Sequence, residues 1–291
     1  MVNKRYKIGN LIFKISSPVD YKDEGTLSLF LTNEEKEDFK VNIELVDKLP
    51  QKIDNPIYAS NEKICTEDSK EACCYFKNID SFGKNDLIYA RKRMKYGEDK
   101  CTISILEYMQ DKICERVILI FLSLEELLAE KRCVIFHSSY INLNGKAIIF
   151  TGPCGMGKST QANLWNKYRN TPIINGDKTL LYEDNKVFMA GGLPISGSSV
   201  FCENVSLPIG AIIKLGQSRE NMIKRLTGFD AFNAVMGSCY PVTYSKYLIN
   251  KEIDFAEKLS ANVPVFYYEC LPNESAVDYL EEMLCQVQEN L

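Results

Sequence analysis

The stretch FTGPCGMGKSTQANLW, residues 150–165, places three glycines, a lysine and adjoining hydroxyl side chains between an apolar run and a helical pattern. Its spacing from Gly152 to Ser159 matches G-x-x-x-x-G-K-[ST]. Glycine tolerates positive φ, so successive backbone N–H groups of such a loop can point at one anion. The pattern predicts a phosphate-binding loop formed by Gly152, Pro153, Cys154, Gly155, Met156, Gly157, Lys158, Ser159 and Thr160.

The residues on either side of the loop support this prediction. GKAIIF, residues 145–150, is typical of a short buried strand, and STQANLWNKY, residues 159–168, has helical spacing. A helix that follows such a loop directs its positive N-terminal end at the bound phosphates. In this arrangement Lys158 reaches the β- and γ-phosphates of a nucleotide and Ser159 binds Mg²⁺. We therefore expect ATP and Mg²⁺ as cofactors.

Composition excludes several classes of protein. A chain of 291 residues with 45% hydrophobic residues has room for one large or two modest domains with a buried core. The net charge of −4 gives no basic field for nucleic acid. The most apolar run, VILIFL at residues 117–122, is too short to span a membrane. The apolar part of the N-terminus is interrupted by Lys14 and lacks a small-residue cleavage site, so we expect a cytoplasmic protein without a signal peptide.

The cysteines are expected to be reduced. There are 11, scattered along the chain without a C-x-x-C pair, and there is a single histidine. An odd number of scattered cysteines does not resemble a disulfide framework, and one histidine disfavours a mixed Cys/His zinc site. We expect mostly buried thiols, with Cys154 as a non-catalytic member of the phosphate-binding loop.

The chain divides into two parts by pattern. Residues 1–110 are expected to form a smaller β-rich domain with an antiparallel sheet. Its evidence is a turn at Gly9-Asn10 and period-two alternation at residues 25–32 and 39–46, followed by two strands around residues 97–99. Residues 111–291 are expected to form the nucleotide-binding domain. After a helix over residues 112–131, strands and helices alternate, which predicts an α/β fold with its ligands at the carboxyl ends of strands.

Two further side chains are candidates for the site. Asp177 follows the first strand after the phosphate-loop helix, and its strand reaches the phosphates if it pairs beside the strand that feeds the loop. Asp177 can act as a base, bind the metal or only cap its turn. His137 precedes the strand that feeds the loop and is either structural or catalytic. Arg219 and Arg225 are weaker candidates, because arginines on a helix surface are common.

The segment IFHSSYINLNGKAIIFTGPCGMGKSTQANLW, followed by INGDKTLLYEDNKVFMAGGLPISGSS, resembles the HPr kinase and ATP-type phosphoenolpyruvate carboxykinase-like P-loop family. It resembles more closely the small bacterial HPr kinase-related proteins that often accompany peptide-modification genes. The resemblance covers roughly residues 137–232. It implies a P-loop kinase domain in which Lys158 and Ser159 hold ATP and Mg²⁺. It further implies that Asp177 acts on the acceptor hydroxyl and binds metal, with His137 close to the metal and phosphates.

Three positions depart from the pattern of that family. Thr160 stands where HPr kinase has Glu, Gly176 stands where it has the first of two Asp residues, and Ser198 stands where related small proteins have a basic residue. The expected function is an ATP-dependent kinase that phosphorylates a hydroxyl, foremost a serine of a peptide or protein. A small-molecule kinase and a non-catalytic nucleotide-binding switch remain open, as does a homo-oligomer. A free edge of the N-terminal sheet would recognise a peptide acceptor.

Overall fold

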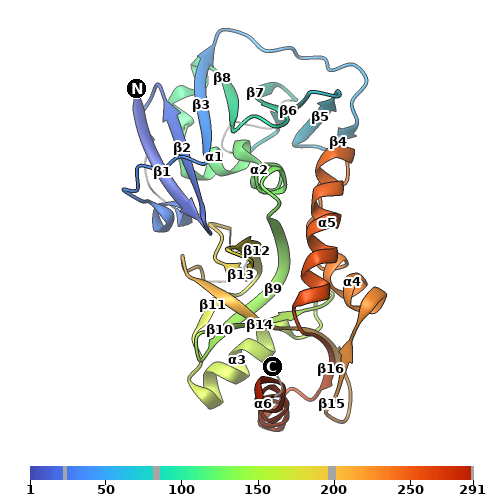
Figure 1. Ribbon diagram of the computed structural model, residues 1–291. Helices are drawn as coiled ribbons and strands as arrows, with labels where there is room; N and C mark the ends of the chain where they lie inside the picture. The colour runs from blue at the N-terminus through green and yellow to red at the C-terminus, as the bar shows by residue number, and fades with distance from the viewer. Residues whose placement is uncertain (22–24, 81–85, 196–200, 290–291) are drawn as a thin grey trace. The chain divides into compact units, whose positions relative to one another are not determined.

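The computed structural model describes residues 1–21, 25–80, 86–195 and 201–289, and Figure 1 traces the chain. It forms two compact units, residues 1–131 with 242–249 and residues 132–241 with 250–291. The division falls after Lys131 rather than near residue 110. The two helices that precede Lys131 pack on the N-terminal sheet: the ring of Phe121 lies 5.1 Å from that of Phe76. The chain is a mixed α/β protein with two large sheets.

The sheet of the first unit has the strand order β1-β2-β3-β8-β7-β6-β5-β4. In chain order its strands are β1 (Val2–Ile8), β2 (Leu11–Ser17), β3 (Phe39–Val46), β4 (Tyr58–Ala59), β5 (Lys63–Glu67), β6 (Glu71–Lys77), β7 (Ile88–Lys95) and β8 (Lys100–Leu106). The predicted hairpin at Gly9 is confirmed, with φ 62° at that glycine and antiparallel pairing of β1 with β2.

The sheet is mixed, so the expectation of an antiparallel sheet was wrong. Strand β3 pairs parallel with both β2 and β8. The predicted strand at residues 25–32 is instead a 3₁₀ helix, η1 (Thr26–Phe30). Leu27 and Phe30 are both buried, because residues three apart lie on one face of such a helix. The chain returns through η1 to the end of the sheet at which β2 begins, so β3 runs parallel to β2.

One edge of this sheet is partly covered, and the other ends in a short strand. Along β1, the N–H of Thr32 donates to the carbonyl of Arg5, and Leu31 forms a bridge with Tyr6. At the opposite edge, β4 spans two residues. Addition of a long peptide strand to either edge is therefore restricted.

The single helix expected over residues 112–131 is broken. The chain forms η2 (Glu107–Lys112), α1 (Glu115–Leu122) and α2 (Leu124–Glu130), with Ser123 at φ 43° between the two α-helices. The carbonyls of Leu122 and Ser123, freed by the break, accept hydrogen bonds of 2.9 and 3.5 Å from Nζ of the fully buried Lys92. A lysine on a strand thus stabilises a helix break that helical periodicity does not predict.

A buried charge network joins α2 to the sheet and to residues 242–249. The Glu126 carboxylate lies 2.5 Å from Lys92 Nζ and 2.7 Å from Lys63 Nζ, and it accepts a hydrogen bond from Tyr244. Its oxygen also accepts a hydrogen bond from the thiol of Cys74, which lies 2.7 Å from that of Cys65. These two thiols and this carboxylate have metal-ligand spacing. The carboxylate is already paired with two ammonium groups, however, and burial raises the pKa of the Cys74 thiol, so the cluster functions as an ion-pair network.

The second unit contains a sheet with the order β10-β9-β12-β13-β14-β16-β15, and β14 also pairs with β10, so five of these strands form a closed circuit. Its strands are β9 (Val134–Leu143), β10 (Lys146–Thr151), β11 (Ile173–Asn175), β12 (Lys178–Asp184), β13 (Val187–Gly191), β14 (Ser206–Gln217), β15 (Met222–Leu226) and β16 (Val265–Cys270). Its helices are α3 (Lys158–Arg169), α4 (Gly228–Met236), α5 (Lys246–Asn262, whose first turn belongs to the first unit) and α6 (Glu274–Glu289).

Helices cover both faces of this sheet. On one face Trp165 of α3 and Leu280 of α6 pack on alternate residues of β10 and β14, including Ile148 and Ile213. On the other face Val235 of α4 and Leu259 of α5 pack on the residues between, including Ile149 and Ile212. This arrangement confirms the predicted α/β class. In the part of the chain that the structure describes, no helix is long and apolar enough to cross a membrane.

Arg219 and Arg225 do not lie on a helix. Arg225 belongs to β15, an edge strand that pairs antiparallel with β16, and Arg219 lies in the turn before it. Strand β15 has one face in solvent, and its short polar sequence resembles a helix surface when read alone. Neither arginine lines the cavities described below.

Candidate functional site

The glycine-rich loop has the predicted strand–loop–helix setting. Strand β10 ends at Thr151 and helix α3 begins at Lys158. Gly152, Gly155 and Gly157 have φ values of 141°, 78° and 104°, a region that L side chains rarely adopt. These three positions therefore require glycine, and the loop they form lies at the positive N-terminal end of α3.

Lys158 is folded back onto its own loop. Its Nζ donates hydrogen bonds of 3.0 and 3.1 Å to the carbonyls of Gly152 and Pro153, and the residue is 8% exposed. Within the described residues it forms no ion pair. Burial lowers its pKa from the usual value, since an ammonium loses hydration there. The charge is held by neutral carbonyls alone and is available to an anion that enters the loop.

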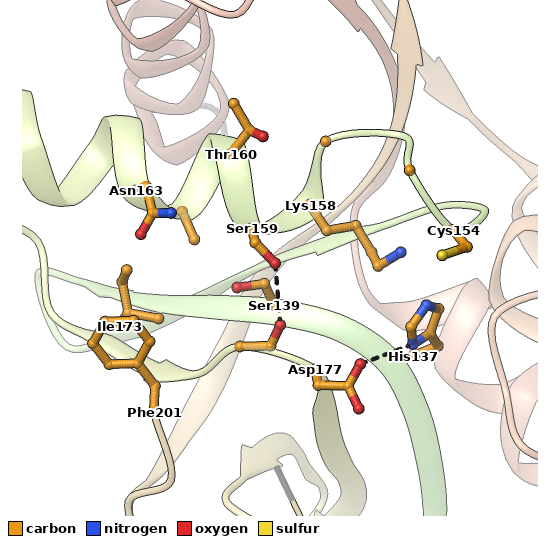
Figure 2. Close-up of a pocket in the computed structure, with 14 residues that line it drawn as sticks. His137, Ser139, Cys154, Lys158, Ser159, Thr160, Asn163, Ile173, Asp177 and Phe201 are labelled. Atoms are coloured by element: carbon orange, nitrogen blue, oxygen red, sulfur yellow. Dashed lines mark hydrogen bonds and ion pairs between the residues drawn. The ribbon is translucent and has the colours of Figure 1, made fainter. Parts of the chain in front are cut away.

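Asp177 reaches the same site by a route other than the expected one. Strand β11, which precedes it, pairs antiparallel with β9 instead of beside β10. The buried side-chain oxygen of Asn175 accepts hydrogen bonds from the N–H groups of Asp177 and Lys178, both at 3.0 Å, and the carbonyl of Asp177 accepts one from the N–H of Ser138. Asn175 is thus the residue that caps this turn. The carboxylate of Asp177 is left to project into the cavity (Figure 2).

His137 lies inside β9 rather than at a strand end. It marks the point where β9 changes partner: His137 is opposite Lys178 of β12, whereas Ser138 is opposite Thr151 of β10. The His137 N–H donates to the carbonyl of Ser238 at 2.7 Å, and the Thr151 hydroxyl donates to the carbonyl of His137 at 2.8 Å. These bonds fix the backbone, so the ring position is set by the fold.

The imidazole of His137 connects Asp177 with a tyrosine that the sequence did not indicate. Its Nδ1 lies 3.7 Å from Oδ1 of Asp177 and 3.0 Å from the hydroxyl of Tyr240. Burial, followed by the charge of Lys158, lowers the pKa of His137 from its usual value. The ring is therefore neutral at neutral pH, and the tyrosine hydroxyl can donate to it. Burial also raises the pKa of Tyr240, which keeps that hydroxyl protonated.

His137 and Asp177 line a cavity of about 510 Å³. Of the predicted residues, it brings together His137, Cys154, Gly155, Gly157, Lys158, Ser159, Thr160 and Asp177. The lining also contains residues that the sequence analysis did not select: Ser139, Ala162, Asn163, Ile173, Gly176 and Phe201. In Figure 2 the end of the cavity with Lys158 and His137 lies apart from an end formed by Asn163, Ile173 and Phe201. Such a cavity suits a molecule that has one charged, polar part and one partly apolar part.

A second cavity, of about 380 Å³, lies along the other side of His137. Gly152 and Pro153 of the glycine-rich loop line this cavity instead of the first one, together with His137, Lys214, Ala234, Gly237, Ser238, Cys239 and Tyr240. Met156 lines neither of the two cavities and packs against the sheet core. His137 is thus shared by two neighbouring spaces.

The donor set fits a magnesium ion. Ser159 and Asp177, the predicted ligands, both line the first cavity, and the hydroxyl of Ser159 donates to the carbonyl of Gly176 at 3.4 Å. Hydroxyl, carboxylate and carbonyl oxygens are the ligands that Mg²⁺ prefers. The position of Ser198, where the family pattern has a basic residue, lies outside the described residues.

Comparison with known proteins gives little. No family model and no curated protein matches this sequence. Among solved structures the chain is similar to the HPr(Ser) kinase/phosphatase from Coxiella burnetii, with a TM-score of 0.35 and 9% sequence identity over 53% of this chain and 98% of that chain. A likeness this distant says nothing of what the present chain binds.

Proposed function

We propose that the chain is a Mg²⁺- and ATP-dependent kinase that transfers the γ-phosphate to a hydroxyl group. The observation that carries this proposal is the convergence of Lys158, Ser159, Asp177 and His137 on one cavity at the N-terminus of α3. Phosphoryl transfer is catalysed mainly by positioning and by neutralising charge, and these residues supply both. The loop N–H groups and Lys158 bind the phosphates, once Lys158 exchanges its two carbonyl partners for phosphate oxygens.

Asp177 is the proton acceptor in this proposal. The acceptor hydroxyl loses its proton to the Asp177 carboxylate, its oxygen forms the new bond to phosphorus, and the bond to the β-phosphate oxygen breaks to release ADP. The neutral ring of His137 lies 3.7 Å from Asp177 and orients the carboxylate and the acceptor. Bound Mg²⁺ supplies charge neutralisation on the β- and γ-phosphates, and Ser159 and Asp177 are the residues that would hold it.

The experiment follows the labelled γ-phosphate of ATP in the presence of purified protein and a cell extract. Transfer of label to an acceptor, protein or small molecule, is the expected result and also identifies the acceptor class. Release of inorganic phosphate without a labelled acceptor would instead support a nucleotide-binding switch, the alternative raised by Ser198. Absence of any nucleotide binding would contradict both functions.

A further inference from the structure

Lys214 breaks an apolar strand at the end nearest the glycine-rich loop. Residues 211–213 and Leu215 of β14 are buried apolar side chains, as expected for a parallel strand covered on both faces. Lys214 is opposite Thr151, the residue that precedes Gly152, and it shares its face of the sheet with Ile212. A lysine there is unexplained by packing. It stands at the carboxyl end of the strand, where α/β sheets bind their ligands.

The ammonium of Lys214 has no partner of its own. Among the described residues no carboxylate, carbonyl or hydroxyl lies within bonding distance of it, although the residue is only partly exposed. It is also the one lysine among the described residues that line the second cavity, and no carboxylate is part of that lining. A partly desolvated cation without a counter-ion is stabilised by any anion that enters beside it.

Backbone hydrogen bonds tie residues 238–240, which line the second cavity, to strand β9. Ser238 accepts a hydrogen bond of 2.7 Å from the N–H of His137, and the N–H of Tyr240 donates to the carbonyl of Ile135 at 2.8 Å. Phe136 and Cys239 form a bridge between these two bonds. The cavity is therefore built into the fold, with His137 as the boundary to the nucleotide cavity, and its 380 Å³ suits a small molecule or one or two side chains.

We propose that this second cavity binds the phosphate acceptor and that Lys214 binds a carboxylate close to the acceptor hydroxyl. This inference rests on the proposed kinase function and adds the chemistry of its substrate: a hydroxy acid, or a hydroxyl residue beside an acidic one in a peptide. The hydroxyl then lies at His137, which lines both cavities and is 3.7 Å from Asp177, and the carboxylate lies on Lys214. The competing anion for Lys214 is the γ-phosphate itself.

The test is a calorimetric titration of protein that is saturated with Mg²⁺ and the non-hydrolysable ATP analogue AMP-PNP. Glycerate and glycerol form one matched pair of probes, with and without a carboxylate. Acetyl-Asp-Ser-amide and acetyl-Asn-Ser-amide form a second pair, which separates a peptide acceptor from a free hydroxy acid. The wild type should prefer the anionic member of at least one pair by roughly 10–100-fold, the range of one charge-assisted contact.

Three variants assign that preference to its residue. Lys214→Met should abolish the preference, Lys214→Arg should retain most of it, and Lys224→Met, on the exposed face of β15, should leave it unchanged. AMP-PNP should bind all three with wild-type affinity. A preference that survives Lys214→Met, or no saturable binding of either anionic probe to the nucleotide-loaded wild type, would overturn the inference. So would a loss of AMP-PNP affinity without loss of ADP affinity, because Lys214 would then serve the γ-phosphate. Failure of the wild type to bind AMP-PNP would instead contradict the kinase proposal.

Discussion

Buried and half-buried lysines have different partners in the two units. In the first, Lys63 and Lys92 lie 2.7 and 2.5 Å from the Glu126 carboxylate, so the charges are paired inside the core. In the second, Lys158 contacts only backbone carbonyls of its own loop, and Lys214 has no partner among the described residues. Removal of one partner of a buried ion pair destabilises the fold. A buried charge without an internal counter-ion is instead stabilised when a ligand supplies the opposite charge. Charges in the first unit should thus govern stability, and those in the second should govern binding and turnover.

The largest effect is expected at Asp177. Replacement by Asn keeps the shape and removes the basicity, so transfer should fall by about 10²–10⁴-fold, the span of a general base. ATP affinity should hold, because the loop and Lys158 make the phosphate contacts. If Asp177 acts mainly as the magnesium ligand, excess Mg²⁺ will partly restore the rate of the variant. An unchanged rate would leave the kinase proposal without a base.

The corresponding experiment in the first unit removes the charge of Glu126. Glu126→Gln leaves the buried ammonium group of Lys92 without a counter-ion and Lys63 with Glu125 alone, so it should lower the free energy of unfolding by about 3–5 kcal/mol. Glu125→Gln is the matched control, since Glu125 is 36% exposed and lies 3.1 Å from the same Lys63. Chemical denaturation of both variants measures the difference. Equal stability of the two would break the contrast between the units.

Asn175 tests the link between a turn and the site. Asn175→Ala leaves the N–H groups of Asp177 and Lys178 without their acceptor, at a cost of about 1–3 kcal/mol in stability. Because the carboxylate then loses its fixed position, transfer should slow while ATP affinity changes little. Denaturation and steady-state kinetics on one preparation check both parts. Full activity with reduced stability would mean that the turn does not position Asp177.

The smallest effect concerns the protonation of His137. Its pKa is lowered in the folded chain below the ordinary value of about 6.5, so the unfolded chain binds more protons between the two values. The contribution to stability is complete above pH 6.5 and declines as the pH falls from there toward the folded pKa. Unfolding free energies of the wild type and His137→Gln, compared across this window, should converge as the pH falls. Parallel curves would show that the ring is not desolvated.

The part of the site that local sequence determines was predictable. The glycine spacing, the strand before it and the helix after it depend on adjacent residues, and the hairpin turn at Gly9 is of the same kind. The residues that complete the site come from distant segments. Tyr240 meets His137 across 103 positions of sequence, and no local pattern marks such a pair. Asn175 did carry a local signal, since Asn before Gly favours a turn, but the sequence analysis considered only Asp177 as a possible cap of that turn.

Contacts between distant elements explain the other differences between the predicted and the observed structure. The partners of β3 and β11, the helix break at Ser123 and the Glu126 network all depend on contacts between segments far apart in the chain. The boundary near residue 110 followed from pattern alone and separated α1 and α2 from the sheet they cover. Residues 242–249 belong to the first unit although they lie within the second in sequence, so a simple N-terminal deletion would leave them without their partners.

The most direct test of the central claim is a titration of Mg²⁺ and AMP-PNP into the wild type and Lys158→Met, with the free energy of unfolding measured on each. If the unpaired ammonium of Lys158 exists to bind phosphate, the variant should lose at least about 10-fold in affinity, the effect of one charge-assisted contact. It should also unfold with a free energy no lower than that of the wild type, because the replaced charge had no counter-ion. Unchanged affinity together with a large loss of stability would contradict the account, since Lys158 would then be structural and the glycine-rich loop would not be a nucleotide site.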